Sequence, residues 1–105
     1  MKAEEKQYEI IISPEAEQEL NISKEFYESK QAGLGKRFVK EVDNTINRII
    51  ENPVQFPKIK QKQVRKANVN RFPFGIYFAV KDSIINILAV FHFSRNPKKI
   101  KKRLK

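Results

Sequence analysis

The segment 74-FGIYFAVKDSIINILAVFHF-93 determines the fold that the rest of the chain has to complete. Apolar side chains alternate with other residues along its first eight positions, which predicts a β-strand over 74–81. The sequence Lys-Asp-Ser at 81–83 predicts a tight turn. Residues 84–93 are apolar at nearly every position, as in a central strand that is covered on both faces. The segment therefore predicts two neighbouring strands at the centre of a sheet.

Two amphipathic helices and a further strand are predicted upstream of this segment. Residues 8–13 are rich in β-branched side chains and indicate a short strand. A Ser-Pro pair at 13–14 supplies an N-cap and a proline at the first helical position, and the apolar stripe that follows predicts a helix to about Gln31. The glycines within 32–35 end it. A second apolar stripe then runs to the Asn-Pro pair at 52–53.

The order of the predicted elements is β-α-α-β-β-β, in the α+β class. The loop between the helices is short, so they should fold back as a helical hairpin, packed on one face of a small, largely antiparallel four-stranded sheet. Residues 53–63 read as a loop and 64–69 as a weak strand. We predict a single domain over residues 1–105, with a basic C-terminal tail from about 96 that forms either a short helix or a frayed end. The other face of the sheet should meet solvent or a partner.

The composition excludes several classes of protein. The chain has 105 residues and no cysteine, which excludes disulfide frameworks, thiolate zinc sites and thiol catalysis. One histidine and no acidic cluster with ligand spacing predict no metal and no cofactor. The charged start, Met1 to Gln7, has no signal-peptide pattern, and the longest apolar run is about half a membrane span. We therefore expect a cytoplasmic protein without membrane association.

Charge is distributed unevenly along the chain. Residues 1–57 hold 8 basic and 11 acidic side chains, whereas residues 58–105 hold 14 basic side chains and one acid, Asp82. A surface that is merely soluble usually mixes both signs. The second half therefore predicts an anionic partner, which the charge alone leaves open as nucleic acid, an acidic protein or a membrane surface.

His92 is the one side chain that could act as a general acid or base near neutral pH, although it could equally be a hydrogen-bonded histidine of the sheet. By strand alternation it shares a face with Leu88 and Val90. Three arginines lie near strand ends, and guanidinium groups bind phosphate through two parallel hydrogen bonds. If the histidine and the arginines share the uncovered sheet face, they could cleave a phosphodiester, or they could simply dock an acidic partner by electrostatic attraction. The candidate catalytic residues are His92, Arg71, Arg95 and Arg65.

Lysines on the loop before the second strand and in the tail form a second candidate set. They could be solvated surface charges, but the near absence of acids in this half favours binding of an anion. The candidate residues for nucleic acid or another anion are Lys58, Lys60, Lys62, Lys66, Lys98 and Lys99. Phe93 lies between His92 and Arg95 and could stack on a base, although packing in the core is the simpler interpretation.

Four stretches resemble the RelE/ParE superfamily, the toxins of bacterial type II toxin–antitoxin (plasmid-stabilisation) modules. They are YEIIISPEAEQEL, GLGKRFVKEVDNTINRIIENPVQFP, VRKANVNRFPFGIYFAV and INILAVFHFSRNPKK, and together they cover essentially residues 8–99. The resemblance implies a helical hairpin on a small sheet, in agreement with the fold predicted above. It also implies growth arrest by the free toxin and a cognate acidic antitoxin that wraps it in a hetero-oligomer. Phe26 and Tyr27 are the expected antitoxin contacts in the apolar groove of the hairpin.

The resemblance leaves two cellular targets open. RelE-like members cleave mRNA on the ribosome with basic side chains and, in some members, a histidine, on the concave face of the sheet. ParE-like members inhibit DNA gyrase and have no nuclease activity. His92, Arg95 and either Arg65 or Arg71 resemble residues of the ribonucleases. The Ser-Pro start, the Gly-Leu-Gly hinge and the His-x-x-Arg-x-Pro ending look more like the ParE or undifferentiated plasmid-stabilisation branch. A third hypothesis is a basic RNA- or DNA-binding module without toxicity.

Overall fold

The computed structural model of the protein describes residues 7–60 and 63–104, so the start of the chain before Gln7 and the candidate Lys62 lie outside the described residues. All six elements predicted from the sequence are present, and a third α-helix and one 3₁₀ turn join them. The elements are β1 (Glu9–Ile12), α1 (Pro14–Lys30), α2 (Leu34–Glu51), the 3₁₀ turn η1 (Pro53–Gln55), β2 (Val64–Asn68), β3 (Phe74–Lys81), β4 (Ile84–His92) and α3 (Pro97–Arg103).

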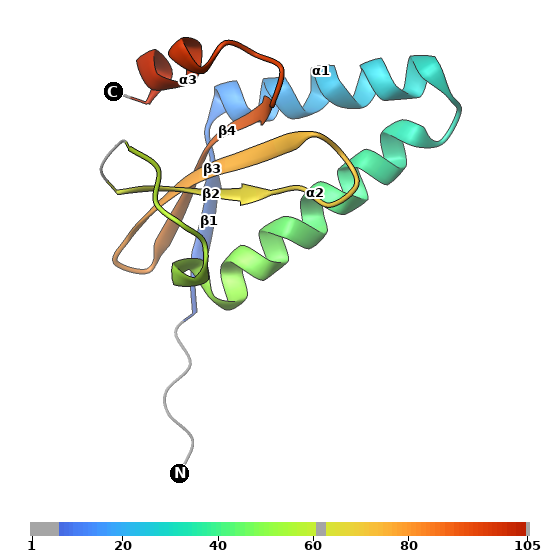
Figure 1. Ribbon diagram of the computed structural model, residues 1–105. Coiled ribbons are helices and arrows are strands. Elements are labelled where there is room, and N and C mark those ends of the chain that lie inside the picture. The colour runs from blue at the N-terminus through green and yellow to red at the C-terminus, as the bar shows by residue number, and fades with distance from the viewer. Residues whose placement is uncertain (1–6, 61–62, 105) are drawn as a thin grey trace.

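The strands form one mixed sheet in the order β1-β4-β3-β2 (Figure 1). β2 and β3 pair antiparallel, as do β3 and β4. β1 pairs parallel with β4, from Glu9 opposite Ile84 to Ile12 opposite Ile87. Because β1 ends there and β4 continues to His92, no strand within residues 7–60 and 63–104 pairs with the last five residues of β4 on the β1 side. This unpaired edge positions the candidate site.

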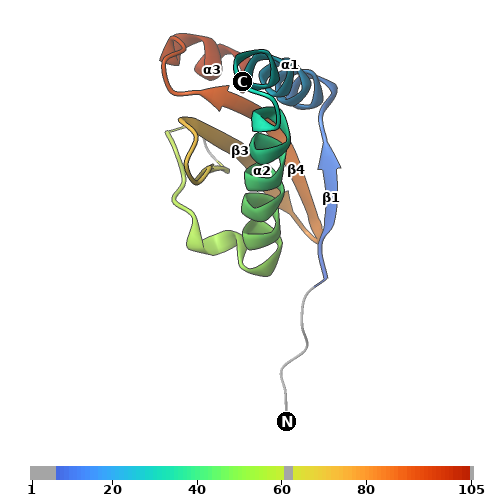
Figure 2. The same cartoon turned by 90° about the vertical axis from the view of Figure 1, so that its right-hand side faces the viewer.

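The helices begin and end where the sequence predicts. The Ser13 side chain accepts a hydrogen bond from the backbone N–H of Ala16 and so caps α1, and Pro14 occupies the first helical position. α1 and α2 meet at Gly33, whose φ of +87° is accessible to glycine at low cost. From this loop the helices diverge, so that α2 crosses the face of the sheet while α1 runs across its end (Figures 1 and 2).

The two helices pack against each other tightly at Gly35. A Cβ atom at this position would lie 2.6 Å from the backbone carbonyl oxygen of Lys24. The Glu28 carboxylate accepts hydrogen bonds from the backbone N–H groups of Gly33 and Gly35, at 2.9 and 3.0 Å, and these bonds hold the pKa of Glu28 below its ordinary value. A carboxylate from α1 therefore caps the start of α2.

Both faces of the sheet are covered by apolar side chains. The larger cluster lies between the helical hairpin and the sheet and includes Phe38, Ile49, Phe78 and Ile85. The smaller cluster lies on the other face, where α3 packs through Ile100. Its buried members are Val64, Tyr77, Ala89, Phe91 and Ile100. The expectation that this second face meets only solvent or a partner was therefore incomplete, because the C-terminal segment folds into a helix that covers part of it.

A bulge in β4 changes which face its side chains occupy. Tyr77 pairs with Ala89 but Phe78 pairs with Ile87, which leaves Leu88 as an extra residue in β4. Ile87 packs in the larger cluster and Leu88 against the smaller one, whereas Val90 returns to the larger cluster. The expectation that Leu88 shares a face with Val90 was wrong for this reason.

The close approach at Gly35 gives a test of the helical hairpin. We expect Gly35→Ala to lower the free energy of unfolding by about 1–3 kcal/mol, because the added methyl group forces the helices apart. The measurement is chemical denaturation followed by circular dichroism. Asn44→Ala, at an exposed position of α2, is the control, since it gains helix propensity without a clash. Equal stabilisation by both substitutions would contradict the close approach.

Candidate functional site

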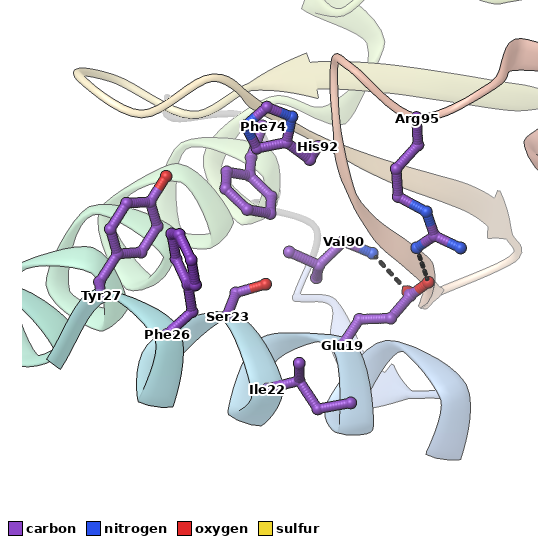
Figure 3. Close-up of a pocket in the computed structure, with 9 residues that line it drawn as sticks. All are labelled: Glu19, Ile22, Ser23, Phe26, Tyr27, Phe74, Val90, His92 and Arg95. Carbon is purple, nitrogen blue, oxygen red and sulfur yellow. Dashed lines mark hydrogen bonds and ion pairs between the residues drawn. The ribbon is translucent and has the colours of Figure 1, made fainter. Parts of the chain in front are cut away.

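An apolar groove of about 300 Å³ lies between α1 and the unpaired edge of β4 (Figure 3). Residues of α1 form one wall, and the ends of β3 and β4 form the other. The residues that line it are Glu19, Ile22, Ser23, Phe26, Tyr27, Phe74, Val90, His92 and Arg95. The groove exists because α1, rather than a further strand, runs beside this part of β4.

Two large apolar side chains of α1 are exposed at the groove. Ile22 is 60% exposed and Phe26 is 55% exposed. Tyr27 is half-buried beside them, with its ring 5.4 Å from that of Phe26 and 5.0 Å from that of Phe72, and burial raises its pKa. Apolar surface of this kind, next to a groove, is typical of a protein–protein interface. The structure thus places both of the predicted antitoxin contacts, Phe26 and Tyr27, at the groove.

Glu19 closes one end of the groove and joins three elements. Its carboxylate accepts a hydrogen bond from the backbone N–H of Val90 at 3.0 Å. It also pairs with Arg95 at 3.1 Å and, through two hydrogen bonds of 2.7 and 3.1 Å, with Arg103 of α3. This interaction raises the pKa of Arg103. Arg103 in turn donates a hydrogen bond to the carbonyl of Leu88 at 2.8 Å. Side chains from α1 and α3 therefore hold the bulge in β4.

The His92 ring packs on the helix-facing side of the sheet, and the residue also lines a hollow of about 270 Å³ on the side of α3, together with Lys66, Phe93 and Arg95. Its ring packs edge-to-face on Phe74, with 4.9 Å between the ring centroids (Figure 3). Its Nδ1 accepts a hydrogen bond from the backbone N–H of Ser94 at 2.9 Å. The histidine is half-buried, so it retains some contact with solvent. The bulge at Leu88 accounts for this placement, because simple alternation from Ile87 puts His92 on the opposite face.

The structure brings only one of the three candidate arginines to the pocket of His92. Arg95 lines the groove, but its guanidinium is stacked 3.7 Å from the Phe91 ring and paired with Glu19. Arg65 donates to the carbonyls of Val54 and Phe56 and so fixes the loop after α2. The third arginine, Arg71, lies on the turn between β2 and β3 and lines a separate hollow beside α2. The catalytic roles of all four candidate residues remain predictions.

The candidate lysines are distributed over two elements and a loop. Lys58 and Lys60 are exposed on the loop before β2, and Lys98 and Lys99 are exposed at the start of α3. The Lys66 ammonium lies 4.6 Å above the Phe93 ring, on the face of the sheet that carries α3. Phe93 is 48% exposed there, so it is not part of the core.

Glu19, Ile22 and Arg103 were not among the site residues predicted from the sequence. Glu19 did carry a signal, because it lies three residues after the buried Ala16 and one before Leu20, on the apolar face of α1. A carboxylate in that position has to find a partner inside the fold. Arg103 carried no such signal, since its neighbours in the tail are basic as well.

Two further findings concern the part of the chain that the structure describes. Within it, no group of three or more His, Cys, Asp or Glu side chains is arranged to hold a metal ion. Nor does any helix within residues 7–60 and 63–104 have the length and apolar character needed to cross a membrane.

The two arginines on Glu19 differ in a way that can be measured. Arg103 makes two hydrogen bonds to Glu19 and has 23% of its side chain exposed, whereas Arg95 makes one hydrogen bond to Glu19 and has 41% exposed. We expect Arg103→Met to lower the free energy of unfolding by about 1–2 kcal/mol and Arg95→Met by less than about 1 kcal/mol. Urea denaturation measures both, with Lys102→Met on the exposed side of α3 as the control. Equal losses for the three variants would contradict the role of Arg103.

Comparison with known proteins agrees with this architecture. A similar solved structure is "Chromosomal ParDE TA system from P. aeruginosa", with a TM-score of 0.71 and 18% sequence identity, over 84% of this chain and 98% of that chain. At that identity the likeness shows the fold. No curated protein matches the sequence.

The family is shown by a match to the sequence model described as "ParE toxin of type II toxin-antitoxin system, parDE", which spans residues 10–97. This range runs from β1 to the start of α3 and contains the whole groove. The chain therefore belongs to the ParE toxin family, and it is the toxin component of a type II toxin–antitoxin module.

Proposed function

We propose that this toxin arrests growth by binding and inhibiting DNA gyrase, without cleaving RNA, and that its cognate antitoxin neutralises it by covering the groove between α1 and β4. The observation that carries the first part is the separation of the candidate catalytic residues. Cleavage of a phosphodiester requires a proton carrier and fixed cations around one phosphate. Here Arg95 is the one candidate arginine that lines the groove with His92, and it is paired with Glu19. Arg65 is bonded to loop carbonyls, and Arg71 lines another hollow.

The position of α3 also favours a mechanism without RNA cleavage. The sequence predicts phosphodiester cleavage on the face of the sheet that the helical hairpin leaves uncovered. In this protein α3 packs on that face, with Ile100 buried against Tyr77 and Phe91. The Arg103–Glu19 hydrogen bonds fasten α3 there. An mRNA strand would have to compete with these contacts.

The antitoxin is the partner that fits the groove. The exposed Ile22 and Phe26 offer apolar anchor points, and the basic side chains around α3 and β2 would attract an acidic chain toward them. The side chains that attract the acidic chain are those of Lys58, Lys60, Lys66, Lys98 and Lys99. Association with an acidic antitoxin should accordingly slow as the salt concentration rises.

Substitution of His92 separates gyrase inhibition from RNA cleavage. His92→Asn keeps an acceptor near the position of Nδ1, and His92→Phe keeps the ring that packs on Phe74. Neither side chain can transfer a proton near neutral pH. We expect both variants to arrest growth like the parent chain, because inhibition by binding needs no proton carrier. The measurement is controlled expression with pulse labelling of DNA and protein synthesis, together with the lengths of cellular mRNAs.

In this experiment DNA synthesis should stop first, with an SOS response and intact mRNA, and the purified toxin should inhibit supercoiling by gyrase. Loss of growth arrest in both variants, combined with cleaved mRNA in cells that express the parent chain, would instead establish ribosome-dependent cleavage. Growth that continues normally without the antitoxin would favour a binding module that is not toxic.

Substitution of Phe26 tests the antitoxin groove. We expect Phe26→Ala to weaken binding of the cognate antitoxin by about 30-fold or more, as for other aromatic anchors at interface centres, and to leave growth arrest intact. Val54→Ala is the matched control, because Val54 is 66% exposed and lies on η1, away from the groove. Equal affinities of the two variants in calorimetry would contradict an antitoxin site at this groove.

A further inference from the structure

A second hollow, of about 490 Å³, shares no lining residue with the apolar groove. It is formed by the first two turns of α2 and the turn that joins β2 to β3. The residues that line it are Leu34, Arg37, Lys40, Glu41, Arg71 and Phe72. Leu34 and Phe72 are half-buried and supply the apolar part of the lining, while the cationic side chains are exposed.

Three cations from two elements converge on this hollow. Arg37 and Lys40 are three residues apart on α2 and therefore lie on one side of the helix. Arg71 reaches the same hollow from the turn. Among residues 7–60 and 63–104, none of these three cations lies within 4 Å of a carboxylate, since the described ion pairs both involve Glu19. Glu41 lines the hollow and is half-buried, so it offsets one of the three charges.

The backbone holds Arg71 in place at a conformational cost. Its φ is +69°, in the left-handed region that residues other than glycine, asparagine and aspartate rarely adopt. The turn is held by hydrogen bonds from Val69 N–H to the Phe74 carbonyl, at 2.9 Å, and from Phe74 N–H to the Phe72 carbonyl, at 2.8 Å. The Phe72 ring packs edge-to-face on Phe38 of α2 at 5.2 Å. The turn is therefore fixed relative to the helix that carries the other two cations.

These cations differ from several others of the described chain, which already have partners. Arg103 and Arg95 are bound to Glu19. Arg65 is bound to backbone carbonyls, and Arg48 and Lys66 lie over the rings of Phe56 and Phe93. The cations of the hollow have no such contact within the described residues. They are placed to bind an anion from outside the protein.

We propose that the hollow formed by Arg37, Lys40 and Arg71 binds a phosphate group of DNA, and that this contact anchors the toxin on the DNA that gyrase holds. The choice of DNA as the source of the phosphate rests on the proposed function. Guanidinium groups match phosphate oxygens through two parallel hydrogen bonds. A duplex carries one negative charge per about 1.7 Å of its axis, so neighbouring phosphates satisfy several cations at once. An acidic protein surface is the alternative that the experiment has to separate.

The first measurement is binding of the full-length toxin to a fluorescein-labelled 20-base-pair duplex, by fluorescence anisotropy at several salt concentrations. Arg71→Gly removes the guanidinium and also relieves the left-handed backbone, so the variant should be at least as stable as the parent chain. We expect its affinity to fall about tenfold and the slope of log K against log salt to decrease by about one. Thermal unfolding of the variant verifies that it is folded.

Lys81→Gln is the matched control. It removes the same formal charge from an exposed position at the far end of β3. We expect it to change the affinity less than threefold and to leave the slope unchanged. Equal effects of Arg71→Gly and Lys81→Gln would overturn the proposal, because they would show that only the overall charge matters. Two double variants repeat the comparison with two charges removed. Arg37→Gln/Lys40→Gln is the test, and Lys24→Gln/Lys81→Gln is its control.

Competition with polyglutamate of the same total charge separates DNA from an acidic protein. We expect the duplex to bind more tightly than polyglutamate. We also expect Arg71→Gly to lower the affinity for the duplex by a larger factor than the affinity for polyglutamate. The reverse order would overturn the choice of DNA and assign the hollow to an acidic protein.

Inhibition of gyrase distinguishes failure of this inference from failure of the proposed function. We expect Arg71→Gly to require about tenfold more toxin than the parent chain to inhibit supercoiling, and Lys81→Gln to inhibit like the parent chain. If the parent chain inhibits gyrase and Arg71→Gly inhibits it equally well, the DNA anchor is wrong while the proposed function stands. If the parent chain does not inhibit gyrase but its DNA binding depends on Arg71, the proposed function and the anchoring role fail, and only the phosphate site is supported.

Discussion

The Glu19 carboxylate binds the backbone of β4 where β1 no longer pairs with it, and the positions of α1 and α3 depend on this interaction. β1 stops at Ile12, so no strand in the described part of the chain pairs with β4 beyond Ile87 on that side. Backbone N–H and C=O groups away from water need a partner. Glu19 accepts from Val90, while Ser13 and Arg103 both donate to the carbonyl of Leu88. These bonds hold α1 beside β4, fasten α3 to the sheet, and leave an apolar groove between α1 and the strand.

The elements were predictable from the sequence because their signals are local. The Ser-Pro start of α1, the glycines around 33–35 and the alternation along β3 each fix a boundary within a few residues. The bulge at Leu88 was not predictable in this way, since residues 84–91 are almost uniformly apolar and satisfy either register. That one extra residue turns the His92 ring from the face with α3 to the face with the helical hairpin. It therefore also changes which side chains surround His92.

Charge patterning predicted a basic half of the chain, but it did not predict which cations are available. Arg65, Arg95 and Arg103 are engaged by carbonyls or by Glu19, so the excess charge counted from the sequence exceeds the charge offered to a partner. The partners of these arginines come from η1, from the loop after it, from α1 and from β4, at sequence separations of 9 to 84 residues. No local pattern reports such contacts. Phe26 and Tyr27 were easier to place, because helical spacing alone puts them beside the stripe that faces the sheet.

A single aromatic cluster separates the apolar groove from the cationic hollow and supports both. Tyr27 lines the groove and its ring lies 5.0 Å from that of Phe72, which lines the hollow, and both rings pack on the buried Phe38. Substituting any of these three rings would disturb both sites and the core together, so a loss of function could not be assigned to one partner. Phe26 and Arg71 are exposed, and each lines only one of the two sites. In a fold this small, substitutions at surface positions can therefore separate the loss of antitoxin binding from the loss of target binding, whereas substitutions in the core cannot.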